Sequence, residues 1–223
     1  MSEMLPSGSL DAAPVRFVVY SDWLCPWCYL GAARLWRLEA EHPGQVEFEW
    51  RSYLLRPWPP SEPRDPEKFR AYTRGWMRIA AEPDAPEFRA WTGDASPPSH
   101  SLPAQIVSKA ALDLGDAAYR ALQTRLFRAY FAESRDISCD PVLREIWGEA
   151  GLATDSFPAP GNADLVARVR ADHEQAHEEG ATGVPALRRA QDDFAIVGAQ
   201  PYELLARWLR RTLERRAIGV TSG

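Results

Sequence analysis

The chain has 223 residues, of which 45% are hydrophobic, so it can bury a substantial core without metals or cross-links. Its net charge of −5 comes from interspersed acidic and basic residues, which excludes a basic surface for nucleic acid. No run approaches the roughly 18 apolar residues that span a bilayer, and residues 1–14 lack the parts of a secretory signal. We therefore expect a soluble, cytoplasmic protein without a membrane partner.

The first part of the chain predicts a strand, a helix and a second strand. Residues 15–20 (VRFVVY) form a short β-branched apolar run, which is typical of a strand buried on both faces. A helix follows from Trp27, and the Pro and Gly within residues 41–45 end it. Residues 46–55 then alternate apolar and polar side chains, which indicates a second strand. This order predicts a parallel unit with a right-handed crossover.

The middle of the chain changes character at a Pro-dense segment, residues 56–69. Helical spacing of apolar residues dominates from there on, and it predicts helices within residues 67–82, 101–115, 117–134 and 141–152. We therefore expect residues 56–162 to form an all-helical insertion. The insertion divides an α/β domain composed of residues 1–55 and 163–223.

The last part of the chain predicts a return to the sheet. A polar helix covers residues 163–179, and two short strands follow, with a turn at Asp192 and Asp193. The final helix has Pro201 at its first position. Its spacing predicts that it buries Leu204, Leu205, Trp208, Leu209 and Leu213.

The most informative motif is the pair Cys25 and Cys28, which flanks Pro26 and Trp27 at the start of the first helix. At a helix N-terminus, unpaired backbone N–H groups and the positive end of the dipole stabilise a thiolate on Cys25, while Cys28 turns inward. Pro26 suits the first helical position because no N–H is needed there, and Trp27 offers a flat apolar surface. Neither spacer residue is basic, so we expect weaker thiolate stabilisation than a His or Lys spacer gives.

Two other motifs contain residues that can bind zinc, but neither predicts a metal site. Zinc requires about four ligands, but the third cysteine, Cys139, lies far away in the helical region, where it is read as a cap or core residue. The motif HEQAH, from His173 to His177, matches a zinc-protease pattern, yet its surroundings are polar and no third ligand is evident. We predict a solvated helix face there and no metal. An inert structural Cys25–Cys28 pair stays open as an alternative.

A third element of a redox site lies distant in the sequence. Val184 and Pro185 follow Gly183 just before a predicted strand, and the bond between them is a candidate cis peptide bond. A cis bond would leave the Val184 backbone available to pair with an extended peptide substrate. The isomer stays open at this point, since most X–Pro bonds are trans.

Together these segments resemble the DsbA family of thioredoxin-fold oxidoreductases, most closely its cytoplasmic FrnE-like branch. The resemblance extends from residue 15 to about residue 211, and it rests on SDWLCPWCYLG, LFRAYFAESRDISCDPVL, TGVPAL and VGAQP. It implies an α/β, thioredoxin-like fold with a large all-helical insertion. It also implies that Cys25 is the exposed nucleophile, Cys28 the buried resolving thiol and Pro185 the cis-proline beside them.

The function implied by the resemblance is thiol–disulfide exchange or isomerisation through a mixed disulfide at Cys25. The expected partners are protein or small-molecule thiols and disulfides, with no cofactor beyond the redox-active disulfide and with glutathione as a candidate co-substrate. Kappa-class glutathione transferases and hydroxychromene-carboxylate isomerases are similar in architecture, but a serine typically replaces their first cysteine. The presence of Cys25 and Cys28 favours redox chemistry over this alternative and over a non-catalytic binding protein.

Two further expectations follow for the surroundings of the pair. We expect the helical insertion to form one wall of the site, with large apolar surface from Trp58, Trp76, Trp91 and Phe131. The strand after Pro185 carries Arg188 and Arg189, whereas the strand at this place in the family is usually apolar. Pairing or substrate preference at that edge is therefore expected to differ.

Overall fold

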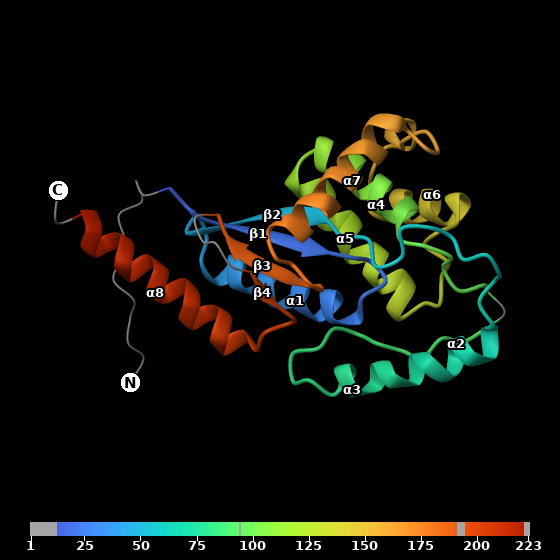
Figure 1. Ribbon diagram of the computed structural model, residues 1–223, viewed down its shortest axis with the longest axis horizontal. Coiled ribbons are helices and arrows are strands. Elements are labelled where there is room, and N and C mark those ends of the chain that lie inside the picture. Colours follow the sequence, from blue (N-terminus) through green and yellow to red (C-terminus); the bar gives the residue numbers. More distant parts are fainter. Residues whose placement is uncertain (1–12, 94, 191–194, 221–223) are drawn as a thin grey trace.

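A computed structural model describes residues 13–93, 95–190 and 195–220 of the chain. Its sheet has the strand order β2-β1-β3-β4, with β1 and β2 parallel and the other two pairs antiparallel (Figure 1). The four strands are β1 (Val15–Ser21), β2 (Val46–Ser52), β3 (Ala186–Arg189) and β4 (Ile196–Val197). The predicted turn at Asp192 and Asp193 lies outside the described residues.

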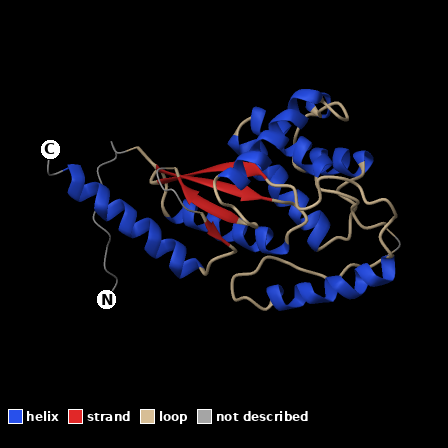
Figure 2. Cartoon of the chain, viewed as in Figure 1, coloured by secondary structure: helices blue, strands red, loops and turns tan. Residues whose placement is uncertain are grey.

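Helices surround this sheet and also form a layer beyond it (Figure 2). The long helices are α1 (Pro26–Glu41), α4 (Leu102–Asp113), α5 (Asp116–Phe131), α6 (Asp140–Glu149), α7 (Ala163–Glu178) and α8 (Tyr202–Val220). The shorter ones are α2 (Pro66–Thr73), η1 (Arg74–Trp76), α3 (Met77–Ala80) and η2 (Thr154–Ser156). The fold is therefore a mixed α/β thioredoxin-like fold, as predicted.

Strand β1 lies in the interior of the sheet and is covered on both faces, as its apolar run predicts. Phe17 and Val19 belong to the core shared with α1 and α8, and the Phe17 ring lies 4.9 Å from that of Trp208. Val18 and Tyr20 point to the other face, where they pack with Ala176 of α7. This alternation follows from the period of two in a strand.

The helices that follow β2 in the sequence share a hydrophobic core with the sheet. Helices α2 to α6 all fall within residues 56–162, where the sequence predicts an insertion. Tyr29 of α1 stacks on Phe127 and Phe131 of α5, with ring centroids 5.1 and 5.5 Å apart. One continuous hydrophobic cluster therefore crosses from the sheet to the helical layer. The division into two domains stays a prediction.

Some details differ from the sequence-based expectation, and one is the start of α8, which begins at Tyr202 rather than at Pro201. Strand β2 ends at Ser52 rather than at residue 55. Tyr53 N still donates to the Ser21 carbonyl, but the next two N–H groups bond to side chains: Leu54 N donates to His173 Nδ1 and Leu55 N to Asp22 Oδ2. In α8, Leu204 is half exposed rather than buried, since it lies one position away from the buried stripe of Leu205 and Leu209.

Candidate functional site

Cys25 is the N-cap residue of α1, with extended backbone angles, and Pro26 occupies the first turn. The Cys28 N–H donates to Cys25 Sγ at 3.3 Å, so the sulfur takes the place of the oxygen that usually caps a helix. A thiolate at this position accepts a backbone hydrogen bond and lies at the positive end of the helix dipole. The local fold therefore brings Cys25 and Cys28 together as the spacing predicts.

The expectation that Cys25 is exposed is wrong in this structure, because both cysteines are buried. Cys25 is 5% exposed and Cys28 is 1% exposed, whereas Trp27 between them is 43% exposed. Cys25 is covered because the loop before β3 packs against it, and its Sγ donates to the Val184 carbonyl oxygen at 3.3 Å. Access to Cys25 is therefore narrow, although it exceeds access to Cys28.

The environment makes the two thiols chemically unequal. Burial raises the pKa of the Cys28 thiol well above its ordinary value, and the neighbouring Cys25 raises this pKa further. The Ser21 hydroxyl and a backbone group at Asp22 oppose this shift. Cys28 is thus held as a neutral thiol at neutral pH. Cys25, Cys28 and Cys139 are free thiols here.

The loop that covers Cys25 contains the Val184–Pro185 bond, and this bond is cis. Helix α1 approaches the loop closely, since a Cβ atom built on Gly31 would lie 3.1 Å from Pro185 Cγ. The Gly198 N–H donates to the Pro185 carbonyl oxygen at 2.7 Å and fixes the loop to the end of β4. Within the described parts of the chain, the Val184 N–H has no hydrogen-bond partner.

The sequence marks Asp22, three residues before Cys25, only as the first residue outside the spacer that could influence the redox potential, and it predicts no contacts for it. Its carboxyl group is buried and accepts hydrogen bonds from Leu24 N at 2.6 Å and Leu55 N at 2.9 Å. Burial raises the pKa of Asp22 to about 6, against the hydrogen bonds from Ser101, Leu24 and Leu55. Its hydrogen-bond partners come from three separate segments of the chain, which the sequence does not bring together. The local signal in the sequence is an acidic residue that follows the apolar run of β1.

The four aromatic residues of the insertion that were expected to form a wall of the site do not contact Cys25, Cys28 or Asp22 through any ring contact or hydrogen bond of the described residues. Trp76, Trp91 and Phe131 are core residues, and Trp58 is exposed beneath the Arg170 guanidinium, 4.4 Å from its ring centroid. Phe131 reaches the helix of the cysteines through Tyr29. The proposed wall role of the insertion thus stays a prediction.

Arg188 on β3 does not extend an apolar strand but forms an ion pair. Its guanidinium donates to both carboxylate oxygens of Glu179, at 2.8 and 2.9 Å. Tyr20 donates to the same carboxylate at 2.7 Å. The charge of Arg188 is therefore paired with Glu179, which follows the C-terminal end of α7.

The zinc-like motif on α7 has a structural use rather than a purely solvated face. His173 Nδ1 accepts a hydrogen bond from Leu54 N at 3.2 Å, and the His173 ring lies 4.8 Å from that of Tyr53. His177 packs against the same two rings. Among the residues that the structure describes, no group of three or more His, Cys, Asp or Glu side chains could hold a metal ion. Cys139 is the N-cap residue of α6.

Among the described helices, none has the length and apolar character needed to cross a membrane.

Comparison with known proteins adds family evidence to this geometry. A family model described as a DSBA-like thioredoxin domain matches residues 16–210. The uncharacterised protein YwbO of Bacillus subtilis is 30% identical over 145 residues, which cover 64% of this chain and 70% of that protein.

Two solved structures are similar over nearly the whole chain. A probable DsbA oxidoreductase from Streptomyces coelicolor is 28% identical, with a TM-score of 0.67 and coverage of 88% of this chain and 89% of that chain. The cytosolic disulfide reductase DsbM from Pseudomonas aeruginosa, solved with GSH, is 23% identical, with a TM-score of 0.69 and coverage of 91% and 99%. The second likeness shows a shared fold.

Proposed function

Because this chain belongs to the family of DsbA-like thioredoxin-domain proteins, we propose that it is a cytoplasmic thiol–disulfide oxidoreductase that uses Cys25 and Cys28. The observation that carries the proposal is the pair itself: Cys25 Sγ caps α1, and Cys28 is buried one turn inside with a raised pKa. This arrangement supports a nucleophile followed by a resolving thiol.

The reaction has two exchange steps. In the oxidising direction, a client thiolate attacks the Cys25–Cys28 disulfide at Cys25, and the pair opens into a mixed disulfide with Cys28 as the leaving thiol. A second client thiolate then releases Cys25. In the reducing direction, the Cys25 thiolate attacks a client disulfide, and Cys28 displaces the client from Cys25. Each exchange step breaks one disulfide bond and forms another. The only co-reactant that the reaction requires is therefore another thiol or disulfide.

Client binding is proposed at the loop around Val184 and Pro185. The Val184 N–H has no hydrogen-bond partner among the described residues, and the carbonyl oxygen of the same residue accepts from Cys25 Sγ; both observations support pairing with the backbone of an extended peptide. Protein and small-molecule thiols are the proposed partners. Glutathione is included as a candidate co-substrate, and no further cofactor is proposed.

The proposal is tested by dithiothreitol-dependent reduction of insulin. We expect the wild type to accelerate the reaction and the Cys25→Ser variant to be inactive. Cys28→Ser should accumulate mixed disulfides and lose multiple turnover. A Cys139→Ser variant serves as the control and should retain wild-type rates. Full turnover by Cys28→Ser would instead support a glutathione-dependent transferase or isomerase, and no turnover by the wild type would support a binding protein.

A further inference from the structure

An apolar pocket lies in the helical layer, where α4, α6 and α7 come together (Figure 1). Its volume is about 300 Å³, which is at the lower end of the range of small-molecule sites. Ile106 of α4, Leu143 of α6 and Val166 of α7 line it, together with the segment 157–161. No Lys or Arg side chain is among the described residues of its wall, so the pocket favours an uncharged ligand over an anion.

The wall formed by the segment 157–161 is held in a fixed shape. The Phe157 ring lies 5.6 Å from that of Trp147, and the guanidinium carbon of Arg144 lies 4.2 Å from the Phe157 ring centroid. Pro158 and Pro160 also line the pocket, and each restricts the backbone of the segment. A pocket with rigid walls loses little conformational freedom when it binds a ligand.

The polar part of the pocket consists of the side chains of His100, Ser138 and Asp140. The Asp140 carboxylate already has a partner, because Arg144 Nε donates to it at 2.8 Å. His100 and Ser138 belong instead to one chain of hydrogen bonds, which determines what His100 can offer to a ligand.

This chain ends on the carboxylate of Asp136. Ser138 Oγ donates to Asp136 Oδ1 at 2.6 Å, which uses the only proton of that hydroxyl. Ser138 Oγ therefore accepts from Ser99 Oγ, 3.1 Å away, and the proton of Ser99 is used as well. Ser99 Oγ must then accept from His100 Nδ1, at 2.7 Å. The chain thus places the ring proton of a neutral His100 on Nδ1 and leaves Nε2 as an acceptor.

The Nε2 atom of His100 is available to a ligand. Burial lowers the pKa of His100 from its ordinary value of 6.5, although Asp136 opposes this shift, so the ring is neutral at neutral pH. Among the described residues, Nε2 has no hydrogen-bond partner. A ligand in the pocket can therefore satisfy this acceptor with an O–H group.

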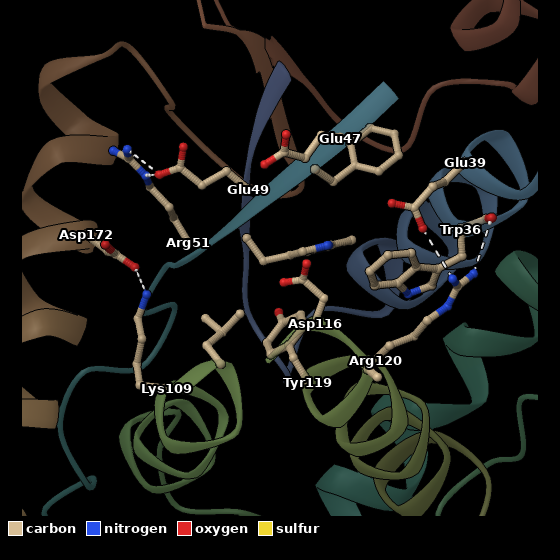
Figure 3. A pocket seen from close by; sticks show the side chains of 14 residues that line it. Trp36, Glu39, Glu47, Glu49, Arg51, Lys109, Asp116, Tyr119, Arg120 and Asp172 are labelled. Atoms are coloured by element: carbon tan, nitrogen blue, oxygen red, sulfur yellow. Dashed lines mark hydrogen bonds and ion pairs between the residues drawn. The ribbon is translucent and has the colours of Figure 1, made fainter. Parts of the chain in front are cut away.

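A larger cleft of about 540 Å³ lies along β2 and differs in its chemistry (Figure 3). Its walls contain the ion pairs Lys109–Asp172, Arg51–Glu49 and Arg120–Glu39. These charged side chains satisfy one another across the cleft. The pocket at His100 combines apolar walls with an acceptor that has no partner, and it is the better candidate for a ligand site.

We propose that the pocket between α4, α6 and α7 binds a small, uncharged phenol, whose hydroxyl donates to His100 Nε2 and whose ring packs against Phe157. An aromatic ring suits the flat apolar wall, and a phenolic hydroxyl supplies the single donor that the acceptor requires. The inference goes beyond the proposed function and does not depend on it, because neither Cys25 nor Cys28 lines this pocket.

The test compares the binding of naphthol with that of methoxynaphthalene, its methyl ether, by isothermal titration calorimetry at neutral pH. The two probes share their rings, but only naphthol has a hydroxyl proton to donate. We expect the wild type to bind naphthol roughly tenfold more tightly than the ether, which is the effect of one hydrogen bond.

Two variants locate the probe. His100→Phe keeps a ring but removes the acceptor, so the preference for naphthol should disappear. Val166→Phe fills the pocket from α7 and should weaken the binding of both probes. His42→Phe is the matched control, since His42 follows the end of α1 and does not line the pocket. Cys25→Ser should bind naphthol as tightly as the wild type does.

The inference is overturned if the wild type binds neither probe, if it binds both equally, or if His100→Phe keeps the preference. If His100→Phe does not fold, Ser138→Ala decides the question. This variant breaks the chain between Ser99 and Asp136, so it should reduce the preference for naphthol, and an unchanged preference would contradict the proposal. Loss of naphthol binding in Cys25→Ser would place the probe at the cysteines and would also contradict it.

Discussion

The buried carboxyl group of Asp22 holds the backbone in place near the cysteines through its hydrogen bonds. Its two carboxylate oxygens accept from Leu24 N and Leu55 N, and its backbone carbonyl accepts from Cys25 N at 3.1 Å. One residue thereby joins the loop before α1 to the segment after β2. Its ionised form is disfavoured by burial, which raises the pKa to about 6.

This raised pKa predicts how stability changes with pH. Between pH 4 and 6, Asp22 keeps its proton in the folded protein but loses it in the unfolded chain, where the pKa is about 3.9. The Asp22 contribution to the free energy of unfolding should therefore fall as pH rises through this window, by about 3 kcal/mol, and stay constant above it. Urea unfolding of the wild type and Asp22→Asn at pH 4 to 7 measures this as the difference between the two proteins.

Other carboxylates with lowered pKa values, such as Asp84 and Glu179, act in the opposite direction, but they are common to both proteins and cancel in the difference. A difference that does not vary from pH 4 to 7 would show that Asp22 is ionised in the folded state throughout.

The spacer residue Trp27 allows a separate test of the redox potential. The wild type lacks a spacer cation, so its potential should lie between roughly −270 and −120 mV, the values of thioredoxin and DsbA. Trp27→His places a hydrogen-bond donor on an exposed position beside Cys25, and it should make the disulfide more oxidising by about 30 mV or more. Equilibration in glutathione buffers measures the shift. An unchanged or more reducing potential would mean that groups outside the spacer determine it.

At the scale of elements, the contact between α1 and the loop before β3 depends on Gly31. A Cβ atom at this position would lie 3.1 Å from Pro185 Cγ and 3.9 Å from the Ala199 side chain. Because Gly31 has no side chain, helix α1, which carries Cys28, packs directly on Pro185.

Gly31→Ala should therefore destabilise the protein, although alanine is the better helix former. Overpacking costs about 1–3 kcal/mol, which exceeds the gain of at most about 1 kcal/mol from helix propensity. Gly148→Ala in α6 is the control, since nothing lies within 4 Å of its added Cβ, and it should be stabilising. Urea unfolding compares the two variants. A stabilised Gly31→Ala would mean that the loop can move away from α1 without cost.

The elements were largely predictable, whereas the connections between them were not. The strand at residues 15–21 and the helix after Pro26 follow from local patterns, and so does the redox pair. The burial of Cys25 depends on Val184, which is 159 residues away, and the partners of Asp22 depend on how three loops meet. Periodicity contains no information on such contacts, because they are fixed by tertiary packing.

At the scale of the whole molecule, Arg34 of α1 joins segments that lie far apart in the sequence. Its side chain is 4% exposed and forms a bidentate pair with Asp84 at 2.7 and 2.8 Å. It also pairs with Glu82 and donates to the backbone carbonyls of Ala199 and Gln200. Five hydrogen bonds from one guanidinium thus connect α1, the segment after α3 and the segment before α8.

Arg34→Met should destabilise the whole fold rather than one element. Removing one partner of a buried ion pair costs about 3–5 kcal/mol, and the partial exposure of the two carboxylates favours the lower value. Arg16→Met, which removes an exposed pair with Glu47 and Glu49, should cost no more than about 1 kcal/mol. Equal losses in urea unfolding of the two variants would contradict this role of Arg34.

The central claim is that Cys25 carries the client and Cys28 removes it. The most direct measurement is mass spectrometry of the protein after brief exposure to oxidised glutathione, with peptide mapping of the modified cysteine in the wild type and in Cys28→Ser. We expect the variant to retain one glutathione, attached to Cys25, because no thiol resolves it. The wild type should release glutathione and end as a Cys25–Cys28 disulfide. An adduct located at Cys28 or Cys139, or one that persists equally in both proteins, would contradict the account.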